Sequence, residues 1–434
     1  MKYALVNPNW DFEGSAYFGC RECHHPLELG YSGALLEAAG FDAIIIDGHM
    51  EGLSQAAIRQ RIEEFSPDFI AVTTAPSYLF WRCPPPELKT PIELMEALAG
   101  IKARKIIMGP HGSVTPAAAM KKLGADIVVM GEPETVLPEI GRNAGAVGRV
   151  SSICVNDSGS PRIQGKARST DMAALLPLKW PVERIQGHTH HHHRFGTRPA
   201  GFGAEVEASR GCPYSCTFCA KDGFRDNYRK RPLHVVLDEL DWLTANGAGY
   251  VYFIDEIFMP DRALLDALAS RNLTFGIQTR IDLWKPEILS LLGAAGCVSI
   301  EAGVESISER GRSLLGKRCS ASTDELVKLL VAARKSVPFV QATLLDSRFD
   351  DIEAVEAWRS SLMDSGVWAN RPVPMFPYPG SEEYSKRWGR PDDYAWERAH
   401  EYYLEVNRSF SDIQNSKPIP LRELERYERA GKNA

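Results

Sequence analysis

The stretch Glu205–Cys219 reads EVEASRGCPYSCTFC and carries three cysteines with CxxxCxxC spacing. Its first five residues begin a series of strand candidates that alternate with helical segments such as 233–245. The cysteines therefore lie in the first strand-to-helix loop of the series. Repeated units of this size suit a full or partial β/α barrel, whose chemistry sits at the carboxyl ends of the strands. The further strand candidates are 250–255, 273–279, 297–302 and 338–345.

The three thiols, Cys212, Cys216 and Cys219, are the chemically most specific feature of the sequence. Thiolates hold iron–sulfur clusters, and three ligands on a four-iron cluster leave one iron open. A structural zinc site normally has a fourth protein ligand and usually pairs two CxxC elements, whereas this stretch supplies one. The chain has nine cysteines, an odd number, which argues against a disulfide framework. We therefore predict a 4Fe-4S cluster at the mouth of the barrel.

Residues 1–145 predict a different architecture, in which short apolar runs alternate with amphipathic segments such as 54–65 and 116–123. This pattern is typical of a parallel sheet covered on both faces, here a five-unit doubly wound, flavodoxin-like domain. Ligands of such sheets lie beyond the carboxyl ends of the strands, so the loops that follow the runs should face a ligand. The apolar runs are 3–6, 43–46, 69–72, 105–108 and 126–130.

The remaining parts of the chain carry weaker signals. Residues 146–203 lose the alternation and contain Gly, Ser, Arg and the His-rich stretch 188–193, so we expect a linker with little regular structure and solvated histidines. Residues 204–349 form the predicted barrel, and 350–434 form a C-terminal extension rich in charged and aromatic residues.

Composition excludes several classes of protein. The 434 residues are 44% hydrophobic and 24% charged, as in a globular protein. The formal net charge of −6 gives no electrostatic basis for a nucleic acid partner. The N-terminus lacks the long apolar region of a signal peptide, and no apolar run approaches the roughly 20 residues that span a bilayer. We expect a cytoplasmic protein without a membrane partner.

The cysteine stretch resembles that of the radical S-adenosylmethionine superfamily, in which the open iron binds the amino acid end of S-adenosylmethionine. Residues 252–256, which end in Asp255 and Glu256, are similar to the strand-end motif that receives the methionine amino group. The alternative is a pair of solvated loop acids. Glu301, in the segment 299–306, would reach the ribose by the same resemblance. Residues 340–345 depart from the pattern because they lack the glycines expected near the adenine.

A doubly wound domain ahead of such a barrel resembles the cobalamin-dependent branch of this superfamily. The resemblance rests on Gly109-Pro-His-Gly112, on Gly124-Ala-Asp126 leading to Gly131 and Glu132, and on Tyr378-Pro-Gly-Ser381. It implies that the glycines of these loops let the backbone approach a flat macrocycle or its nucleotide tail. The chain is also similar to the subgroup called the rhizo-twelve system.

Two groups of histidines and cysteines could bind metals in the first domain. Asp47-Gly-His49-Met-Glu-Gly52 matches the DxHxxG pattern that places a histidine on cobalt, but it follows the second strand rather than the first. We therefore predict cobalamin bound without a protein ligand on its lower face. Cys20, Cys23, His24 and His25 could make a second metal site, although reduced thiols and polar histidines beside the corrin are the simpler interpretation.

The resemblance implies an enzyme that methylates an unactivated carbon of a small molecule. One S-adenosylmethionine would yield a 5'-deoxyadenosyl radical that removes a hydrogen atom from substrate, and a second would remethylate cobalamin. A flavodoxin- or ferredoxin-type protein would supply electrons. Two alternatives stay open: a radical cyclase or ring-rearranging enzyme with the same cofactors, and a cobalamin-binding sensor or metal-binding interaction protein. No catalytic residue is assigned, since the cofactors perform the chemistry.

Overall fold

The computed structural model describes residues 1–434 except 11–22, 78–83, 189–198, 221–224, 226 and 407–434. The chain divides into two compact units, and each is discontinuous in sequence. The first unit comprises Met1–Leu178, Cys219–Arg225 and Pro377–Glu405. The second comprises Lys179–Phe218, Asp226–Phe376 and Val406–Ala434.

The first unit contains a seven-stranded sheet with the order β2-β1-β3-β4-β5-β6-β7. The first five strands are parallel, and β6 and β7 add an antiparallel hairpin at the β5 edge. The 2-1-3-4-5 order confirms the predicted flavodoxin-like fold, whose switch point lies between β1 and β3. The strands are Lys2–Asn7 (β1), Asp42–Asp47 (β2), Phe69–Thr73 (β3), Arg104–Met108 (β4), Ile127–Val129 (β5), Ile153–Asp157 (β6) and Ser160–Gln164 (β7).

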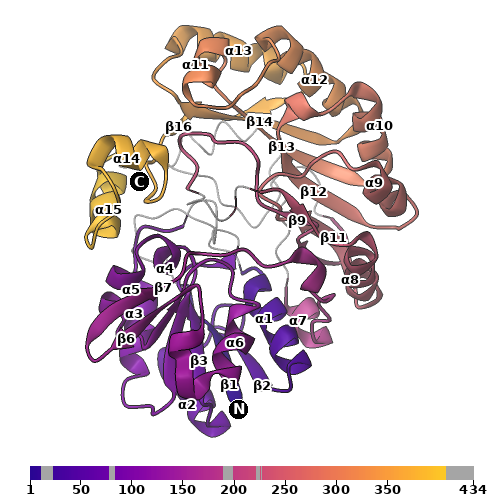
Figure 1. Cartoon of the computed structure of the whole chain (residues 1–434). Coiled ribbons are helices and arrows are strands. Elements are labelled where there is room, and N and C mark those ends of the chain that lie inside the picture. The colour runs from indigo at the N-terminus through magenta and orange to yellow at the C-terminus, as the bar shows by residue number, and fades with distance from the viewer. Residues whose placement is uncertain (11–22, 78–83, 189–198, 221–224, 226, 407–434) are drawn as a thin grey trace. The chain divides into compact units, whose positions relative to one another are not determined.

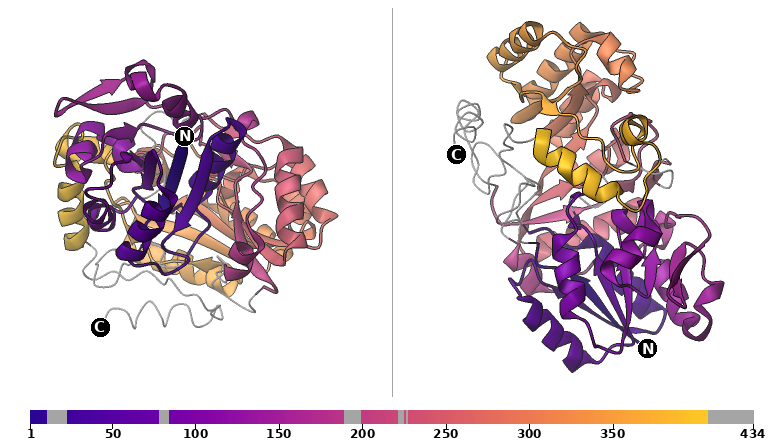
Figure 2. Two further views of the ribbon diagram at one scale, coloured as in Figure 1. Left: turned by 90° about the horizontal axis from the view of Figure 1, so that it is seen from below. Right: turned by 90° about the vertical axis from the view of Figure 1, so that its left-hand side faces the viewer.

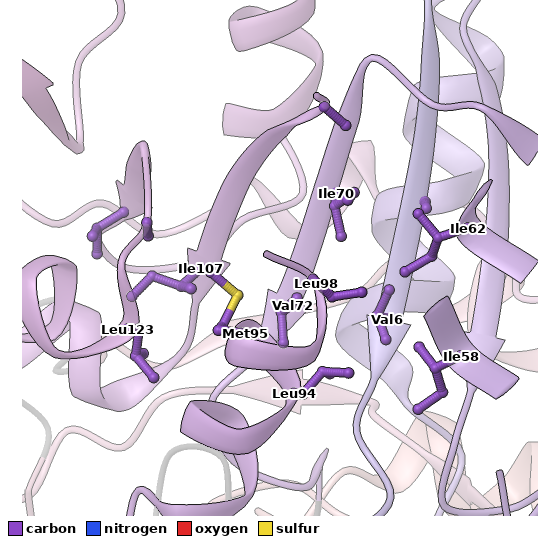
Figure 3. Packing of buried hydrophobic residues seen from close by; sticks show 14 of the residues in the cluster. Val6, Ile58, Ile62, Ile70, Val72, Leu94, Met95, Leu98, Ile107 and Leu123 are labelled. Atoms are coloured by element: carbon purple, nitrogen blue, oxygen red, sulfur yellow. The ribbon is translucent and has the colours of Figure 1, made fainter. Parts of the chain in front are cut away.

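Helices cover both faces of this sheet (Figures 1 and 2). The central strands β1, β3 and β5 are buried on both faces, which explains their continuous apolar runs. On one face, Val6 and Val72 pack against Ile58 and Ile62 of α2 and Leu94 of α3 (Figure 3). The helices are Leu27–Ala38 (α1), Gln55–Phe65 (α2), Lys89–Ala97 (α3), Pro110–Val114 (α4), Pro116–Leu123 (α5) and Val136–Arg142 (α6), with the 3-10 helix Ala144–Arg149 (η2).

The prediction of a linker with little regular structure over residues 146–203 is wrong for much of this range. Residues 153–164 form the hairpin β6–β7, in which Val129 of β5 pairs with Ile153 and Cys154 is buried in the core of the unit. Asp157-Ser158-Gly159-Ser160 makes the turn, with Ser158 and Gly159 both at positive φ (53° and 91°), as a tight hairpin turn requires. A 3-10 helix (η3, Met172–Ala174) and α7 (Val182–Gly187) follow.

The second unit contains an all-parallel sheet with the order β15-β14-β13-β12-β11-β8, and β16 pairs with β14. This is the predicted partial β/α barrel, and each expected strand is present within a few residues. The strands are Phe202–Val206 (β8), Ala248–Phe253 (β11), Thr274–Thr279 (β12), Cys297–Glu305 (β13), Phe339–Asp346 (β14), Trp368–Ala369 (β15) and Val373–Pro374 (β16).

The two faces of this sheet differ in chemistry, since alternate residues of a strand point to opposite faces. One register row is apolar and buried: Val206, Phe253, Ile277, Ile300 and Val340. The next row toward the carboxyl ends, on the opposite face, is polar and half-buried: Gln278, Glu301 and Gln341. A face with polar side chains in the middle of its strands can bind a polar ligand.

Helices lie along one side of the second sheet (Figure 1). Side chains cap the N-terminal ends of several of these helices, most completely at α12, where Ser322 and Glu325 form a reciprocal capping box. Asp261 and Asp351 cap α9 and α13 by accepting a hydrogen bond from a backbone N–H, without a reciprocal bond. The helices are Leu233–Ala245 (α8), Arg262–Ala269 (α9), Pro286–Ala294 (α10), Glu309–Leu314 (α11), Thr323–Ser336 (α12) and Ile352–Asp364 (α13).

The described part of the C-terminal extension divides between the units. Its first half supplies α13, β15 and β16 to the second unit, whereas residues 377–405 belong to the first. This later segment contains α14 (Glu382–Trp388) and α15 (Ala395–Val406). Ser381, from the glycine-containing stretch 378–381, caps α14 by accepting a hydrogen bond from Tyr384 N at 3.1 Å.

Candidate cofactor sites

The cysteine loop of the second unit starts from a short strand pair. Ser209–Arg210 (β9) pairs antiparallel with Arg229–Lys230 (β10). Gly211 then turns the chain at φ +82°, a left-handed conformation that favours glycine. Its backbone N–H donates to the Glu256 carboxylate at 2.8 Å. The residue before Cys212 is thus tied to the carboxyl end of β11.

A second backbone contact supports the loop at Cys216. Thr217 N donates to Leu315 O at 3.0 Å, on the far side of Cys216 from Gly211. Gly316 has φ +66°, and a Cβ there would lie 2.8 Å from Ser215 O. A glycine is therefore required for this close approach. Cys212 and Cys216 are half-buried, and Cys219 is exposed.

Charged groups surround the loop. Burial raises the pKa of the Cys216 thiol, the Glu305 carboxylate adds to the rise, and Lys317 and Arg280 oppose it. Lys317 pairs with Glu305. The Arg280 guanidinium lies 3.8 Å from the centre of the Tyr214 ring. Metal coordination deprotonates a thiol outright, so three thiols with CxxxCxxC spacing in the sequence, together with Lys317 and Arg280 near Cys216, supply a donor set whose chemistry fits an anionic iron–sulfur cluster.

Asp255 and Glu256 follow β11, as expected, but they are not solvated loop acids. Asp255 is 1% exposed and accepts hydrogen bonds from Ala208 N at 2.9 Å and from the Ser209 hydroxyl. Burial raises the pKa of Asp255 to about 7, although these hydrogen bonds oppose the rise. In this arrangement Asp255 fastens the chain that leads into the cysteine loop. Its contact with the methionine amino group stays a prediction.

Glu301 lies in the middle of β13 on the polar face, with Gln278 and Gln341 as its register partners on either side. Gln341 Nε2 donates to Thr343 Oγ1 at 3.4 Å. Glu301 is half-buried. The proposed contact with the ribose stays a prediction.

The glycines predicted to face cobalamin lie at the carboxyl ends of β4 and β5 in the first unit. Gly109 has φ +130° and Gly131 has φ +84°, conformations that favour glycine. Gly131 is covered by the backbone of Arg168, with which it forms a β-bridge, and a Cβ at Gly131 would lie 2.2 Å from Arg168 O. The absence of a side chain at Gly109 fits the approach of a flat macrocycle. Close packing also favours glycine at position 112, because a Cβ on Gly112 would lie 2.5 Å from Val128 Cγ1. The contacts of these glycines with cobalamin stay predictions.

Glu132 is buried rather than open to a ligand. It is 0% exposed and accepts from Thr170 N at 2.6 Å. Its other oxygen pairs with Arg225 Nε at 2.9 Å, and Arg225 is itself buried. Glu134, also buried, accepts from the Thr170 hydroxyl at 2.9 Å. The described contacts of Glu132 are therefore structural, within the first unit.

A polar network at the switch point was not foreseen from the sequence. Asn7 Nδ2 donates to Asp47 Oδ1 at 2.8 Å, and Trp10 Nε1 donates to Asn7 Oδ1 at 2.7 Å. The Thr73 hydroxyl lies 3.5 Å from the same oxygen. Asn7, Asp47 and Thr73 are the last residues of β1, β2 and β3, and all three are buried. The only sequence signal was a polar residue at the end of each strand, which is too common to identify a site.

The histidine predictions have mixed outcomes. His49 is half-buried in the turn after β2, and its carbonyl accepts from Cys23 Sγ at 3.4 Å. Whether it ligates cobalt stays untested. Cys20 lies outside the described residues, and so does most of the stretch 188–193. His188 itself is not solvated: it is 1% exposed, with Nε2 3.0 Å from Glu205 Oε1, so the expectation was wrong there.

Two domain families match the chain. The B12 binding domain matches residues 20–141, and the Radical SAM superfamily matches residues 206–356. Together they span more than half of the chain. They agree with the cofactors expected from the sequence: cobalamin for the first domain, and S-adenosylmethionine with a 4Fe-4S cluster for the second. The rhizo-twelve likeness stays a prediction.

Several characterised and uncharacterised proteins are similar to the chain. An uncharacterized methyltransferase of Pyrococcus horikoshii is 24% identical over 67% of this chain and 63% of its own length. The anaerobic magnesium-protoporphyrin IX monomethyl ester cyclase of Cereibacter sphaeroides is 25% identical over 76% and 55%. The chain thus spans less than two thirds of the length of these relatives.

A solved structure shares the fold. The radical S-adenosylmethionine methyltransferase TsrM from Kitasatospora setae, with cobalamin and a 4Fe-4S cluster bound, superimposes with a TM-score of 0.67. The match covers 88% of this chain and 76% of TsrM at 18% identity, so it shows the fold alone.

Among the described residues, no helix has the length and apolar character needed to cross a membrane.

Proposed function

Because this chain belongs to the cobalamin-dependent radical S-adenosylmethionine family, we propose that it methylates an unactivated carbon of a small-molecule or natural-product substrate. The observation that carries the proposal is the three-thiol loop at the carboxyl ends of an all-parallel sheet, in one chain with a doubly wound unit of 2-1-3-4-5 order. Neither element alone suggests this reaction. Their combination supports two cofactors acting in succession.

The cofactors supply the difficult chemistry when they are bound. The cluster would cleave one S-adenosylmethionine to a radical that removes a hydrogen atom from substrate, and cobalamin would pass on a methyl group from a second molecule. The protein's part is positioning. Gly211 and Thr217 fix the backbone on either side of the first two cysteines through Glu256 and Leu315.

The polar face of the second sheet is suited to hold S-adenosylmethionine and substrate. Glu301, Gln278 and Gln341 present one carboxylate and two amides in a single register row. Amide and carboxylate groups bind hydroxyls and ammonium groups by directed hydrogen bonds. The opposite face is apolar and buried, so it offers no site to a polar ligand.

A radical cyclase is the second candidate, and the match to the Cereibacter sphaeroides cyclase favours it. Such an enzyme would use the same cysteine loop without net methyl transfer. A cobalamin-binding sensor is less well supported, because the cysteine triad and the polar face have no role in a sensor. A flavodoxin- or ferredoxin-type reductant remains the partner that we propose for either enzyme.

The cysteine assignment can be tested before any substrate is known. Reconstituted without oxygen, the protein should carry about four irons per chain and, once reduced, should release 5'-deoxyadenosine from S-adenosylmethionine. Cys212→Ala, Cys216→Ala and Cys219→Ala should each abolish both. Cys154→Ala, which removes a buried thiol of the first unit, is the matched control. Full iron retention in all three variants would overturn the assignment.

A further inference from the structure

The C-terminal segment contributes a buried tryptophan to the first unit. Trp396 of α15 is 1% exposed, and its ring centre lies 4.1 Å from that of His111. Its indole N–H donates to Thr115 Oγ1 at 2.9 Å. His111 and Thr115 both belong to the turn that follows β4, some 280 residues earlier in the chain. One side chain thus contacts two residues of that turn.

The His111 ring ties this turn to the loop after β3. Nε2 lies 2.8 Å from Pro85 O, which can only accept, so Nε2 carries the hydrogen. Nδ1 then accepts from the Thr74 hydroxyl at 3.0 Å. Burial lowers the pKa of His111 to about 4, so the ring is neutral at physiological pH, in agreement with this hydrogen bonding. The histidine of the Gly-Pro-His-Gly stretch is therefore a structural residue.

The same turn contacts the second glycine loop. Ser113 Oγ donates to Gly109 O at 2.9 Å and accepts from Gly131 N at 2.9 Å. Gly109 and Gly131 are the residues with left-handed φ at the edge predicted to meet cobalamin. A shift of the turn would therefore move Gly109 and disturb the hydrogen bond that Ser113 accepts from Gly131, which the backbone of Arg168 also holds.

The turn has little stability of its own. Helix α4 has five residues, which is little more than one helical turn, and a helix this short is not stable on its own. Two ion pairs also connect this segment to α5. Lys121 pairs with Asp393, which precedes α15, at 3.2 Å, and Lys122 pairs with Glu397 of α15. The acidic partners are at least half exposed, and such pairs contribute little. Trp396 is the main buried contact that α15 makes with the turn among the described residues.

We propose that Trp396 is a positioning residue of the cobalamin site, through which the C-terminal segment sets the affinity of the first unit for cobalamin. It acts through His111 and Thr115, which hold the Gly109–Thr115 turn in the shape that the cofactor meets. The inference rests on cobalamin binding by this unit. It goes beyond the proposed reaction because it concerns a segment outside both matched domain families.

The test compares Trp396→Ala with Trp388→Ala in the full chain. Trp388 lies in the same segment, and its ring packs against Tyr384 and Tyr402 rather than against the β4 turn. Hydroxocobalamin is titrated by absorbance, and unfolding by denaturant is measured on the cobalamin-free protein. We expect Trp396→Ala to weaken binding by about tenfold or more, which corresponds to about 1.4 kcal/mol. Trp388→Ala should change it less than about twofold.

Two milder variants test the same contact if Trp396→Ala fails to fold. Trp396→Phe fills most of the space but lacks the N–H, and Thr115→Val removes its acceptor. Both should weaken hydroxocobalamin binding to an intermediate degree. Equal affinity in wild type and Trp396→Phe, or equal losses in the two alanine variants, would overturn the inference. Failure of the wild type to bind hydroxocobalamin would instead overturn the cobalamin assignment on which it rests.

Discussion

The backbone N–H of Gly211 donates to the Glu256 carboxylate at 2.8 Å. Glu256, which follows the end of β11, thus holds the residue directly before Cys212, the first of the three cysteines. The loop therefore depends on an acid that the sequence suggested only as a ligand of S-adenosylmethionine. Asp255 fastens the preceding residues, Ala208 and Ser209, in the same way. Both acids have a structural role whether or not they contact the cofactor.

Glu256→Ala should therefore lower cluster retention, because the Gly211 N–H loses its acceptor. A side-chain amide can still accept, so Glu256→Gln should keep most of the iron. Iron per chain after reconstitution and desalting is the measurement. The lost hydrogen bond to a charged group is worth about 1.5–3 kcal/mol. If the alanine and glutamine variants lose iron equally, the charge rather than the hydrogen bond supports the loop.

The lower face of cobalt should have no protein ligand. His49→Ala is then expected to leave the absorbance spectrum of bound cobalamin unchanged, since no imidazole–cobalt bond is lost. The spectrum of the wild type should be of the base-off form. A clear spectral change in the variant would show that His49 is a ligand, despite its place after β2 rather than β1.

Stability should fall in acid through His111. Burial lowers its pKa from 6.5 to about 4. The unfolded chain therefore binds more protons than the folded chain between these values, so the free energy of unfolding decreases as pH falls through this window. The contribution present above pH 6.5 and lost near pH 4 is of order 3 kcal/mol.

The pH effect is measured as the difference in the free energy of unfolding between wild type and a His111 variant. Unfolding of wild type and His111→Gln is followed by denaturant at pH 7.5 and pH 5. The variant should be less stable at pH 7.5, and the gap between the two proteins should narrow at pH 5. A gap that is independent of pH would mean that His111 titrates normally in the folded protein.

The sequence predicted strands better than it predicted contacts between distant segments. All ten predicted strands are present, because each contains an apolar run that contributes buried residues to the core of its unit. The hairpin 153–164 was missed because β7 is an exposed edge strand with polar residues at most positions. Its Ser-Gly turn was the available signal.

The site residues also differ in whether their role depends on neighbours in the sequence or on distant segments. The cysteine triad and its place after a strand follow from local spacing. The burial of Glu132 against Thr170 and Arg225 could not be predicted, because Thr170 lies 38 residues away and Arg225 lies still farther along the chain, both beyond the hairpin. The contact of Trp396 with His111 joins residues from opposite ends of the sequence. A buried tryptophan in a charged helix has no periodic pattern that indicates its partner.

The most direct test of the account is the fate of a methyl label. S-adenosylmethionine labelled on its methyl group is supplied to reduced, cobalamin-loaded protein with candidate substrates, starting from products of neighbouring genes. A methyltransferase should produce substrate-dependent 5'-deoxyadenosine and S-adenosylhomocysteine in comparable amounts, with the label in product, because hydrogen abstraction and remethylation each consume one molecule. Substrate-dependent 5'-deoxyadenosine without label in product would contradict methyl transfer and favour the cyclase.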